Sequence, residues 1–365
     1  MHFLGIISES LLYLCFSILI GSFLLSIFPS TYRPAFRVSK GFLMAATVGI
    51  AILSFVPVLQ IILYLYEDIG FTATFTSVLF TFEVGKAWIF TYLVANVLFI
   101  YIVWFDYRKK AWYALIGIAL TFILILALGW SGHASSYDPV WGFINHTVHF
   151  TAVSVWVGIL LVVSWFSTNH SNWFNFLKWF SPVAIICFVT TMLSGLYLMT
   201  IVVDYKDYMN SWMLPYGQAL LIKHLLIIPL IVYAFINSVF VRKELNRNVD
   251  FNPIRWTKAE SLVVFLIFAA TAALGQQEPP HDIRTTLASS GVSKLFDLFY
   301  QGTITRDSIV LLGLNFNNMM LLIIALLFLG LIIASYIKRT SNIFSFTMSV
   351  LLVFTVYLSL IVSIR

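Results

Sequence analysis

The stretch FNNMMLLIIALLFLGLIIASYI, residues 316–337, contains no charged side chain. A helix of this length, at about 1.5 Å per residue, crosses the roughly 30 Å hydrocarbon core of a bilayer. Similar apolar stretches occur at about 9–28, 41–66, 82–105, 111–130, 143–167, 174–203, 217–241, 256–274 and 343–363. They are continuous rather than alternating, which argues against a transmembrane β-barrel. The sequence therefore predicts an all-α, polytopic transmembrane helical bundle of about ten spans.

The composition agrees with this class of protein. The chain is 61% hydrophobic and 10% charged, whereas soluble domains carry about 25% charged residues. No stretch between the spans is long enough for an ordinary folded domain. We expect helices 1 and 2 in residues 1–80, a core of helices 3–8 in 81–275, an outer loop in 276–315, and helices 9 and 10 in 316–365. The expected location is the bacterial cytoplasmic membrane, which the chain crosses many times.

Basic residues gather in alternate loops and so predict the orientation. The positive-inside rule places the loops that are rich in Lys and Arg in the cytoplasm. Both termini are then outside, and the N-terminal apolar stretch is a first span rather than a cleaved signal. The net charge of +6 comes mostly from these cytoplasmic basic residues, which we call the basic collar. The expected partners of the collar are anionic membrane lipids and not nucleic acid. The collar consists of Arg33, Arg37, Lys40, Arg108, Lys109, Lys110, Lys178, Arg242, Lys243, Arg247, Arg255, Lys258, Lys338 and Arg339.

The predicted outer loops carry more acidic than basic residues, and such a surface concentrates cations. Simple solvation of the loops is an equally good explanation. The longest outer loop, 275–315, contains the segment Val292–Tyr300. This segment has the pattern of an amphipathic helix that lies on the membrane surface, where it either caps the outer face or is simply a connector.

Histidine is the most informative residue type, because polar side chains at membrane depth usually mark a functional site. The prediction places six of the seven histidines on the outer side: His2, His133, His146, His149, His224 and His281. His146 and His149 are three residues apart and share one helical face, and His224 lies at a depth similar to that of His149. Neutral imidazole binds copper, zinc and haem iron.

We therefore predict a metal site formed by His133, His146, His149 and His224. For His2 and His281 the simpler interpretation is a hydrogen-bonded interface residue. His170 faces the other side of the membrane and is expected to be solvated.

Charged and soft side chains near the predicted site have more than one explanation. Glu83 and Lys86 are spaced to pair on one helix face, and a buried pair that holds helices together is the preferred role. Glu83, Lys86 and Lys223 are expected as charged groups around the ligands, and Glu9 is a further candidate carboxylate. Methionine sulfur favours Cu(I), so the possible soft ligands are Met192, Met199 and Met213, although Met also fills apolar gaps. Cys15 and Cys187 lie in separate spans, so a disulfide between them is not expected.

Several motifs resemble those of the CopD/PcoD copper-resistance membrane proteins. TTMLSGLY at 190–197 and PYGQALLIKH at 215–224 resemble the family pattern T-x-x-x-G-L, an outer loop, and T-x-Y-G-x-x-L-L-x-K. Gly132-His133-Ala134 and His149 with Trp156-Val157-Gly158 resemble its G-H-A and H-x6-W-x-G elements. The resemblance covers about residues 80–280. Leu214-Pro215 replaces the threonine region, and many relatives have eight spans rather than ten. We expect no fused CopC-like domain.

The resemblance implies a copper-handling membrane protein that binds copper at the extracytoplasmic face, for uptake or transfer across the membrane. An extracytoplasmic copper-binding protein is a possible partner. No Walker-type phosphate loop or P-type pump motif is present, so we expect no hydrolytic activity. One alternative is a membrane redox protein with haem b bound by His149 and His224. Because the histidines lie at one depth, they do not fit a two-haem arrangement. A second alternative is a non-catalytic assembly partner for a cuproenzyme.

Overall fold

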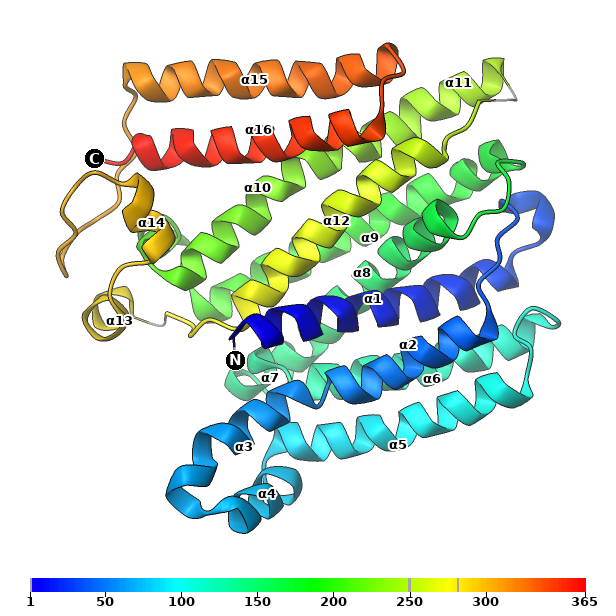
Figure 1. Cartoon of the computed structure of the whole chain (residues 1–365), viewed down its shortest axis with the longest axis horizontal. Coiled ribbons are helices and arrows are strands. Elements are labelled where there is room, and N and C mark those ends of the chain that lie inside the picture. The colour runs from blue at the N-terminus through cyan, green and yellow to red at the C-terminus, as the bar shows by residue number, and fades with distance from the viewer. Residues whose placement is uncertain (1, 249–250, 281) are drawn as a thin grey trace. The chain divides into compact units, whose positions relative to one another are not determined.

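The computed structural model describes residues 2–248, 251–280 and 282–365 (Figure 1). Within these residues, ten helical stretches are long and apolar enough to cross a membrane. The same residues contain no β-strand, only two isolated bridges. The predicted all-α polytopic bundle is therefore confirmed. The chain folds as two compact units, one comprising residues 1–201 with 245–254 and the other 202–244 with 255–365.

The first unit is built around α1 and α8, which pack closely along each other. Its helices are α1 (His2–Ile27), α2 (Lys40–Leu53), α3 (Val56–Ile69), α4 (Phe71–Phe80), α5 (Glu83–Trp104), α6 (Ala111–Trp130), α7 (His133–Tyr137), α8 (Trp141–Trp165) and α9 (Trp173–Val202).

Glycines let the backbones of α1 and α8 touch. A Cβ atom at Gly21 would meet the carbonyl oxygen of Gly158, and a Cβ at Gly158 would meet the carbonyl of Ser17. Small residues at such crossings permit the close packing that holds helices together in lipid. Beside the crossing, the ring of Phe150 lies 5.3 Å from that of Phe16. The glycine of the Trp-Val-Gly motif therefore forms a helix contact.

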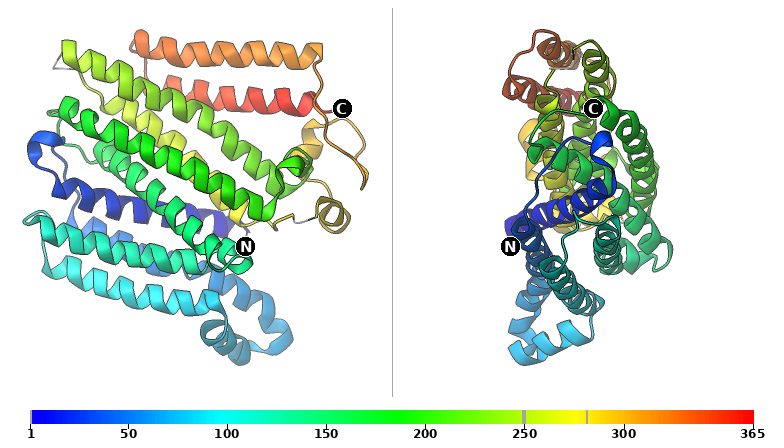
Figure 2. Two further views of the ribbon diagram at one scale, coloured as in Figure 1. Left: turned by 180° about the vertical axis from the view of Figure 1, so that it is seen from behind. Right: turned by 90° about the vertical axis from the view of Figure 1, so that its right-hand side faces the viewer.

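The predicted span at 41–66 is confirmed as one apolar stretch, Lys40–Ile69, but a break at Ser54 and Phe55 divides it into two helices, α2 and α3. Pro57 lies in the first turn of α3, where its missing N–H is tolerated, whereas it would disrupt a continuous helix. Near the break, the indole of Trp88 donates a hydrogen bond of 3.0 Å to the Ala51 carbonyl. The short helix α4, which the sequence did not predict, lies beside α3 (Figure 2).

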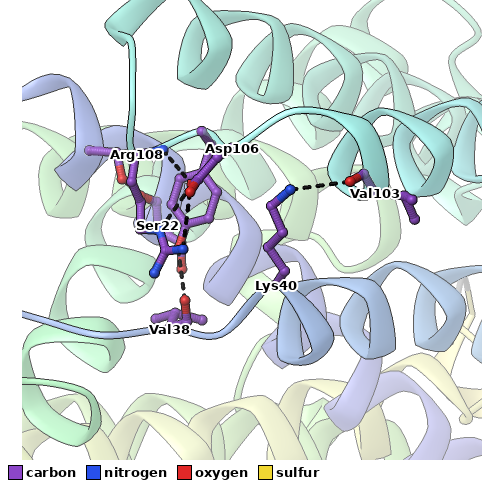
Figure 3. Close-up of polar contacts among 8 residues, drawn as sticks. Ser22, Val38, Lys40, Val103, Asp106 and Arg108 are labelled. Atoms are coloured by element: carbon purple, nitrogen blue, oxygen red, sulfur yellow. Dashed lines mark hydrogen bonds and ion pairs between the residues drawn. The ribbon is translucent and has the colours of Figure 1, made fainter.

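A polar cluster closes the loop between α5 and α6, on the predicted cytoplasmic side (Figure 3). The Arg108 guanidinium donates to Asp106 at 3.0 Å, and this hydrogen bond lowers the pKa of the carboxyl. The Tyr107 hydroxyl donates to the Val38 carbonyl at 3.0 Å, and Lys40 donates to Val103 at 3.2 Å. Burial raises the pKa of Tyr107 to about 12. These bonds fasten the α5–α6 loop to the chain that enters α2.

The second unit contains a long helix that changes its winding. Helix α10 (Pro215–Phe235) continues as a π-helical segment (Ile236–Val241) and then α11 (Arg242–Arg247), which reaches the boundary of the unit. Its other helices are α12 (Ile254–Gly275), α13 (Ile283–Ser290), α14 (Lys294–Phe299), α15 (Phe316–Ile337) and α16 (Asn342–Val362). Helices α15 and α16 form an antiparallel pair (Figure 1).

The segment predicted as amphipathic packs on its own unit. Helix α14 inserts Phe296, which is fully buried, into an apolar cluster with Met213, Leu221 and Tyr357. The backbone N–H of Ser293 also donates to the Met213 carbonyl at 2.8 Å. Of the two alternatives, the structure therefore favours a cap on the end of the second unit.

Candidate metal centre

His149 is oriented by Ser194. The imidazole Nδ1 lies 3.0 Å from the Ser194 hydroxyl oxygen, which joins α8 to α9. The same hydroxyl donates its one hydrogen to backbone carbonyls, at 2.6 Å to Thr190 and 3.3 Å to Thr191. Because a serine hydroxyl has only one hydrogen, it has to accept from His149, whose Nδ1 then carries the proton. In the neutral ring, Nε2 is left with the lone pair that binds a metal.

Glycines from two of the motifs lie against histidine rings. A Cβ at Gly195 would lie 3.1 Å from Cε1 of His149, and one at Gly132 would lie 3.2 Å from Nδ1 of His146. Both distances are shorter than ordinary van der Waals contact, so a larger residue would displace the ring. The motif glycines therefore make room for the two imidazoles.

His146 and His133 belong to the same end of the first unit. His133 begins α7 and is exposed, and His146 is half-buried in the second turn of α8. The hydroxyl of Ser135 donates to the Gly129 carbonyl at 2.5 Å and fixes the turn that carries His133. The contact of His146 with Gly132 places its ring against this turn.

A carboxylate occurs on the helix that packs against α8. Glu9 of α1 forms a hydrogen bond with Tyr13. The Tyr13 ring lies 5.5 Å from the ring of Phe150, the residue that follows His149. Glu9 is therefore one helical turn from a side chain that packs beside the His149 segment.

His224 of the second unit is held by Tyr208. The Tyr208 hydroxyl lies 2.7 Å from Nδ1 of His224, and burial raises the pKa of Tyr208. The phenol therefore keeps its proton, and the hydroxyl can donate to Nδ1 or accept from it. Nε2 binds a metal only in the second of these states. Lys223, which precedes His224 on α10, is half-buried.

The pairing of Glu83 with Lys86 is confirmed, but its predicted burial is wrong. The two side chains lie 2.9 Å apart and are 61% and 42% exposed respectively. The indole of Trp130 also donates to Glu83 at 3.0 Å. Glu83 is the first residue of α5, so its side chain extends past the packed part of the helix. The cluster links α5 to the end of α6, just before the turn that carries His133.

The sulfur-containing side chains differ in how deeply they are buried. Met199 and Met213 are buried and Met192 is half-buried. Met213 belongs to the apolar cluster of the second unit, which is the gap-filling role that methionine often has. Cys15 and Cys187 are free thiols.

The remaining histidines are peripheral. His2 is exposed at the start of α1, and His170 is partly exposed in the connection between α8 and α9. His281 lies outside the described residues. Within the described residues, no group of three or more His, Cys, Asp or Glu side chains is arranged to hold a metal ion. His149 and His224 belong to different units, so their convergence stays a prediction.

Sequence reasoning missed three polar residues. Ser194 lies inside a quoted motif, and Tyr208 is one of several aromatic residues in its loop, so neither was distinctive. Glu260, buried in α12 and bonded to Asn237, had a clear signal: it is an acidic residue within a predicted span.

Comparison with known proteins agrees with these motifs. A family model described as Copper resistance protein D matches residues 174–274, and one described as Copper resistance protein D-like, N-terminal domain, matches residues 2–143. The chain is also 26% identical over 167 residues to the Copper transport protein CutJ of Bacillus subtilis (strain 168). That match covers 44% of this chain and 30% of the relative, so the chain spans less than a third of the relative's length. No solved structure matches significantly.

Between them, the two family models match the larger part of the chain and include the motif regions around His133 and His224. With its many apolar helices, the chain is a multi-pass integral membrane protein, which in bacteria is located in the cytoplasmic membrane. The chain belongs to the copper-resistance protein D family.

Proposed function

We propose that this protein takes copper at its outer face through histidine ligands and transfers it across the cytoplasmic membrane. The observation that carries the proposal is the His149–Ser194–Thr190 chain of hydrogen bonds, because it places the lone pair of the neutral imidazole on Nε2, the atom that would bind a metal. His133 and His146, at the same end of the first unit, are the further ligands proposed there. His224 is proposed as the ligand in the second unit.

The ligand types bear on the form of copper that binds. Imidazole nitrogens alone suit Cu(II), whereas a Cu(I) site would be expected to include Met192, Met199 or Met213. Glu83, Lys86 and Lys223 are proposed to set the charge around the ligands. The acidic outer loops would raise the local concentration of copper ions or attract an extracytoplasmic copper-binding protein.

Copper binding by the purified full-length chain tests the proposal. Wild-type protein in lipid nanodiscs is titrated with Cu(II), and with Cu(I) under a reductant, against a competing chelator. His149→Ala and His224→Ala are each expected to lower bound copper, and the double variant is expected to abolish it. His170→Ala is the matched control and should bind as the wild type does. Full copper content in the double variant would refute the assignment.

An optical spectrum of the same sample separates copper binding from haem binding. A Soret band that shifts on reduction and disappears in the double variant would favour the haem b alternative. Copper uptake into proteoliposomes that contain a copper-sensitive dye then tests transfer. Binding without uptake would leave the role of an assembly partner.

A further inference from the structure

The second unit contains a buried carboxyl group that the copper site does not use. Glu260 of α12 is 4% exposed and Asn237 is 5% exposed. The Asn237 Nδ2 donates to Oε2 of Glu260 at 2.7 Å. Glu260 is six residues from the start of α12, so it lies about 9 Å along the helix from that end. An ionisable side chain at such a position inside a span is expensive and usually functional.

The hydrogen bonding of this pair is incomplete in a specific way. The Oδ1 atom of Asn237 is buried and has no hydrogen-bond partner in the described residues. An unpaired buried acceptor destabilises the fold. The amide of an asparagine has a donor on one side and an acceptor on the other. Asn237 can therefore donate to an ionised carboxylate or, after a half turn of the amide, accept from a protonated carboxyl.

The backbone at Asn237 is also unusual. Asn237 lies in the π-helical segment Ile236–Val241, and such departures from the α-helix frequently occur at functional sites. The segment is packed rather than frayed, because Ile236 and Val241 are buried. The π-helical winding thus places the amide in the interior of the unit, next to the carboxyl.

The charged groups on the elements around Glu260 have other partners or lie near the helix ends. Glu244 of α11 pairs with Arg339 at 2.8 Å. The ring of Tyr336 of α15 packs on Trp256 at 5.0 Å and on Phe240 at 5.7 Å. Among the described residues, Glu260 forms no ion pair with any basic side chain, including those on its own helix and on α11: Arg242, Lys243, Arg247, Arg255 and Lys258.

We propose that Glu260 and Asn237 form a proton-binding site inside the second unit, in which the Asn237 amide serves both protonation states of the carboxyl. One proton is taken up by the carboxylate and the same proton is released, so no other reactant is needed. The two carboxylate oxygens of Glu260 and the amide oxygen of Asn237 are too few for a metal cation that requires six or more oxygen ligands. Where the protein transfers copper, this site supplies coupling to a proton gradient. The coupling to copper transfer rests on the proposed function, whereas the proton-binding site does not.

Infrared difference spectroscopy tests the site directly. The full-length protein in lipid nanodiscs is cycled between pH values, and the carbonyl stretch of a protonated carboxylic acid is recorded. A pH-dependent band is expected that is lost in Glu260→Gln, a change that preserves shape and hydrogen bonding. Asn237→Leu should shift the band in frequency, because the protonated carboxyl loses its hydrogen-bond partner. Glu244→Gln is the matched control, since that carboxyl pairs with Arg339, and it should leave the band unchanged.

Two further results bear on the same assignment. Glu260→Asp retains a carboxyl and should show a displaced band, which keeps the test valid where Glu260→Gln does not fold. A band that persists in folded Glu260→Gln, or that is identical in Asn237→Leu, would overturn the proton site. A band that responds to Na⁺ at constant pH would also overturn it and would assign a metal cation instead.

Uptake into proteoliposomes tests the coupling separately. An imposed proton gradient is expected to change copper uptake by the wild type and to have no effect in Glu260→Gln, whose copper binding should be unchanged. An undiminished response to the gradient in Glu260→Gln would refute the coupling. If the wild type takes up no copper, the proposed function fails, whereas the infrared band still decides the proton site.

Discussion

The Nδ1 atom of His149 donates a hydrogen bond to Ser194 across 3.0 Å, and Ser194 passes its own hydrogen to the carbonyl of Thr190. This chain of donors joins two helices and selects one tautomer of the imidazole. Removing a residue that hydrogen-bonds to a metal ligand without touching the metal typically lowers metal affinity by about 10- to 100-fold. Ser194 is therefore a positioning residue for the His149 imidazole, and its removal should weaken copper binding.

Ser194→Ala should lower copper affinity by about 10- to 100-fold without unfolding the protein. The loss of the hydroxyl removes the Ser194 acceptor from Nδ1 of His149, so the ring no longer favours the tautomer with its lone pair on Nε2. Chelator competition measures the change. Thr200→Ala is the control on the same helix, because the Thr200 hydroxyl bonds only to its own helix, at the Tyr197 carbonyl. Equal affinity in Ser194→Ala and the wild type would contradict the tautomer argument.

Gly195→Ala should also weaken copper binding, by about tenfold or more. The added Cβ would lie 3.1 Å from Cε1 of His149, so the ring has to move. Gly330→Ala is a suitable control, since a Cβ there meets no atom within 4 Å. The prediction fails if both alanine variants bind copper as tightly as the wild type.

Tyr208→Phe should reduce the contribution of His224 to copper binding by about tenfold. The change removes the hydroxyl that lies 2.7 Å from Nδ1 and keeps the ring that packs 5.7 Å from that of Trp212. Chelator competition in the His149→Ala background isolates the effect on His224. Tyr205→Phe, at a residue 59% exposed in the same loop, is expected to change nothing.

Gly158→Ala should lower the thermal stability of the protein in detergent, by about 1–3 kcal/mol. Its Cβ would meet the Ser17 carbonyl on α1, and backbone atoms cannot move aside as a side chain can. Gly330→Ala, which adds the same methyl group in open space, should be neutral or stabilise by up to about 1 kcal/mol. Similar melting temperatures for the two variants would show that α1 and α8 do not touch.

The α5–α6 loop should lose stability at both extremes of pH. The pKa of Asp106 is lowered by the hydrogen bond from Arg108, so its contribution is present above about pH 4 and is lost as the pH falls through the lowered pKa. The pKa of Tyr107 is raised to about 12 by burial, so its contribution is present below about pH 10 and is lost as the pH approaches 12.

Melting temperatures of Asp106→Asn and Tyr107→Phe across the pH range check this prediction. Asp106→Asn should remove the acid-side loss, which is only about 0.2–1 kcal/mol because the Arg108 side chain is 44% exposed and solvent screens the pair. Tyr107→Phe should remove the alkaline loss. Unchanged pH profiles in both variants would contradict the origin of these effects.

The spans were predictable from the sequence because a long apolar run is stable in the bilayer only as a helix. In that form the side chains contact lipid and the backbone hydrogen bonds are made within the segment. The break in the second span was harder to predict, since Pro57 is compatible with a kink or with a new helix. The Glu83–Lys86 pair follows from helical spacing, which is local. The exposure of the pair depends on where α5 stops packing against its neighbours. This position cannot be read from the spacing of residues along one helix.

The histidines of the candidate site were predictable by residue type, whereas their partners were not. Ser194 is 45 residues from His149, and serine is common in these spans, so only the packing of α8 on α9 identifies it. Tyr208 differs from its aromatic neighbours only by its distance to His224. Glu260 was predictable from the sequence, as an acidic residue inside the predicted span 256–274.

The glycine crossing of α1 and α8 limits how the first unit can move. A slip of one helical turn, about 5.4 Å, would bring Ser17 or Leu25 to the place of Gly21 against Gly158, and their side chains would collide with the facing backbone. Helices α1 and α8 therefore move as one rigid pair, and His149 is a residue of that pair. In the proposed transfer, an inward step of a bound ion would require rotation of this helix pair as a whole, or withdrawal of Ser194 by α9 and release of the imidazole.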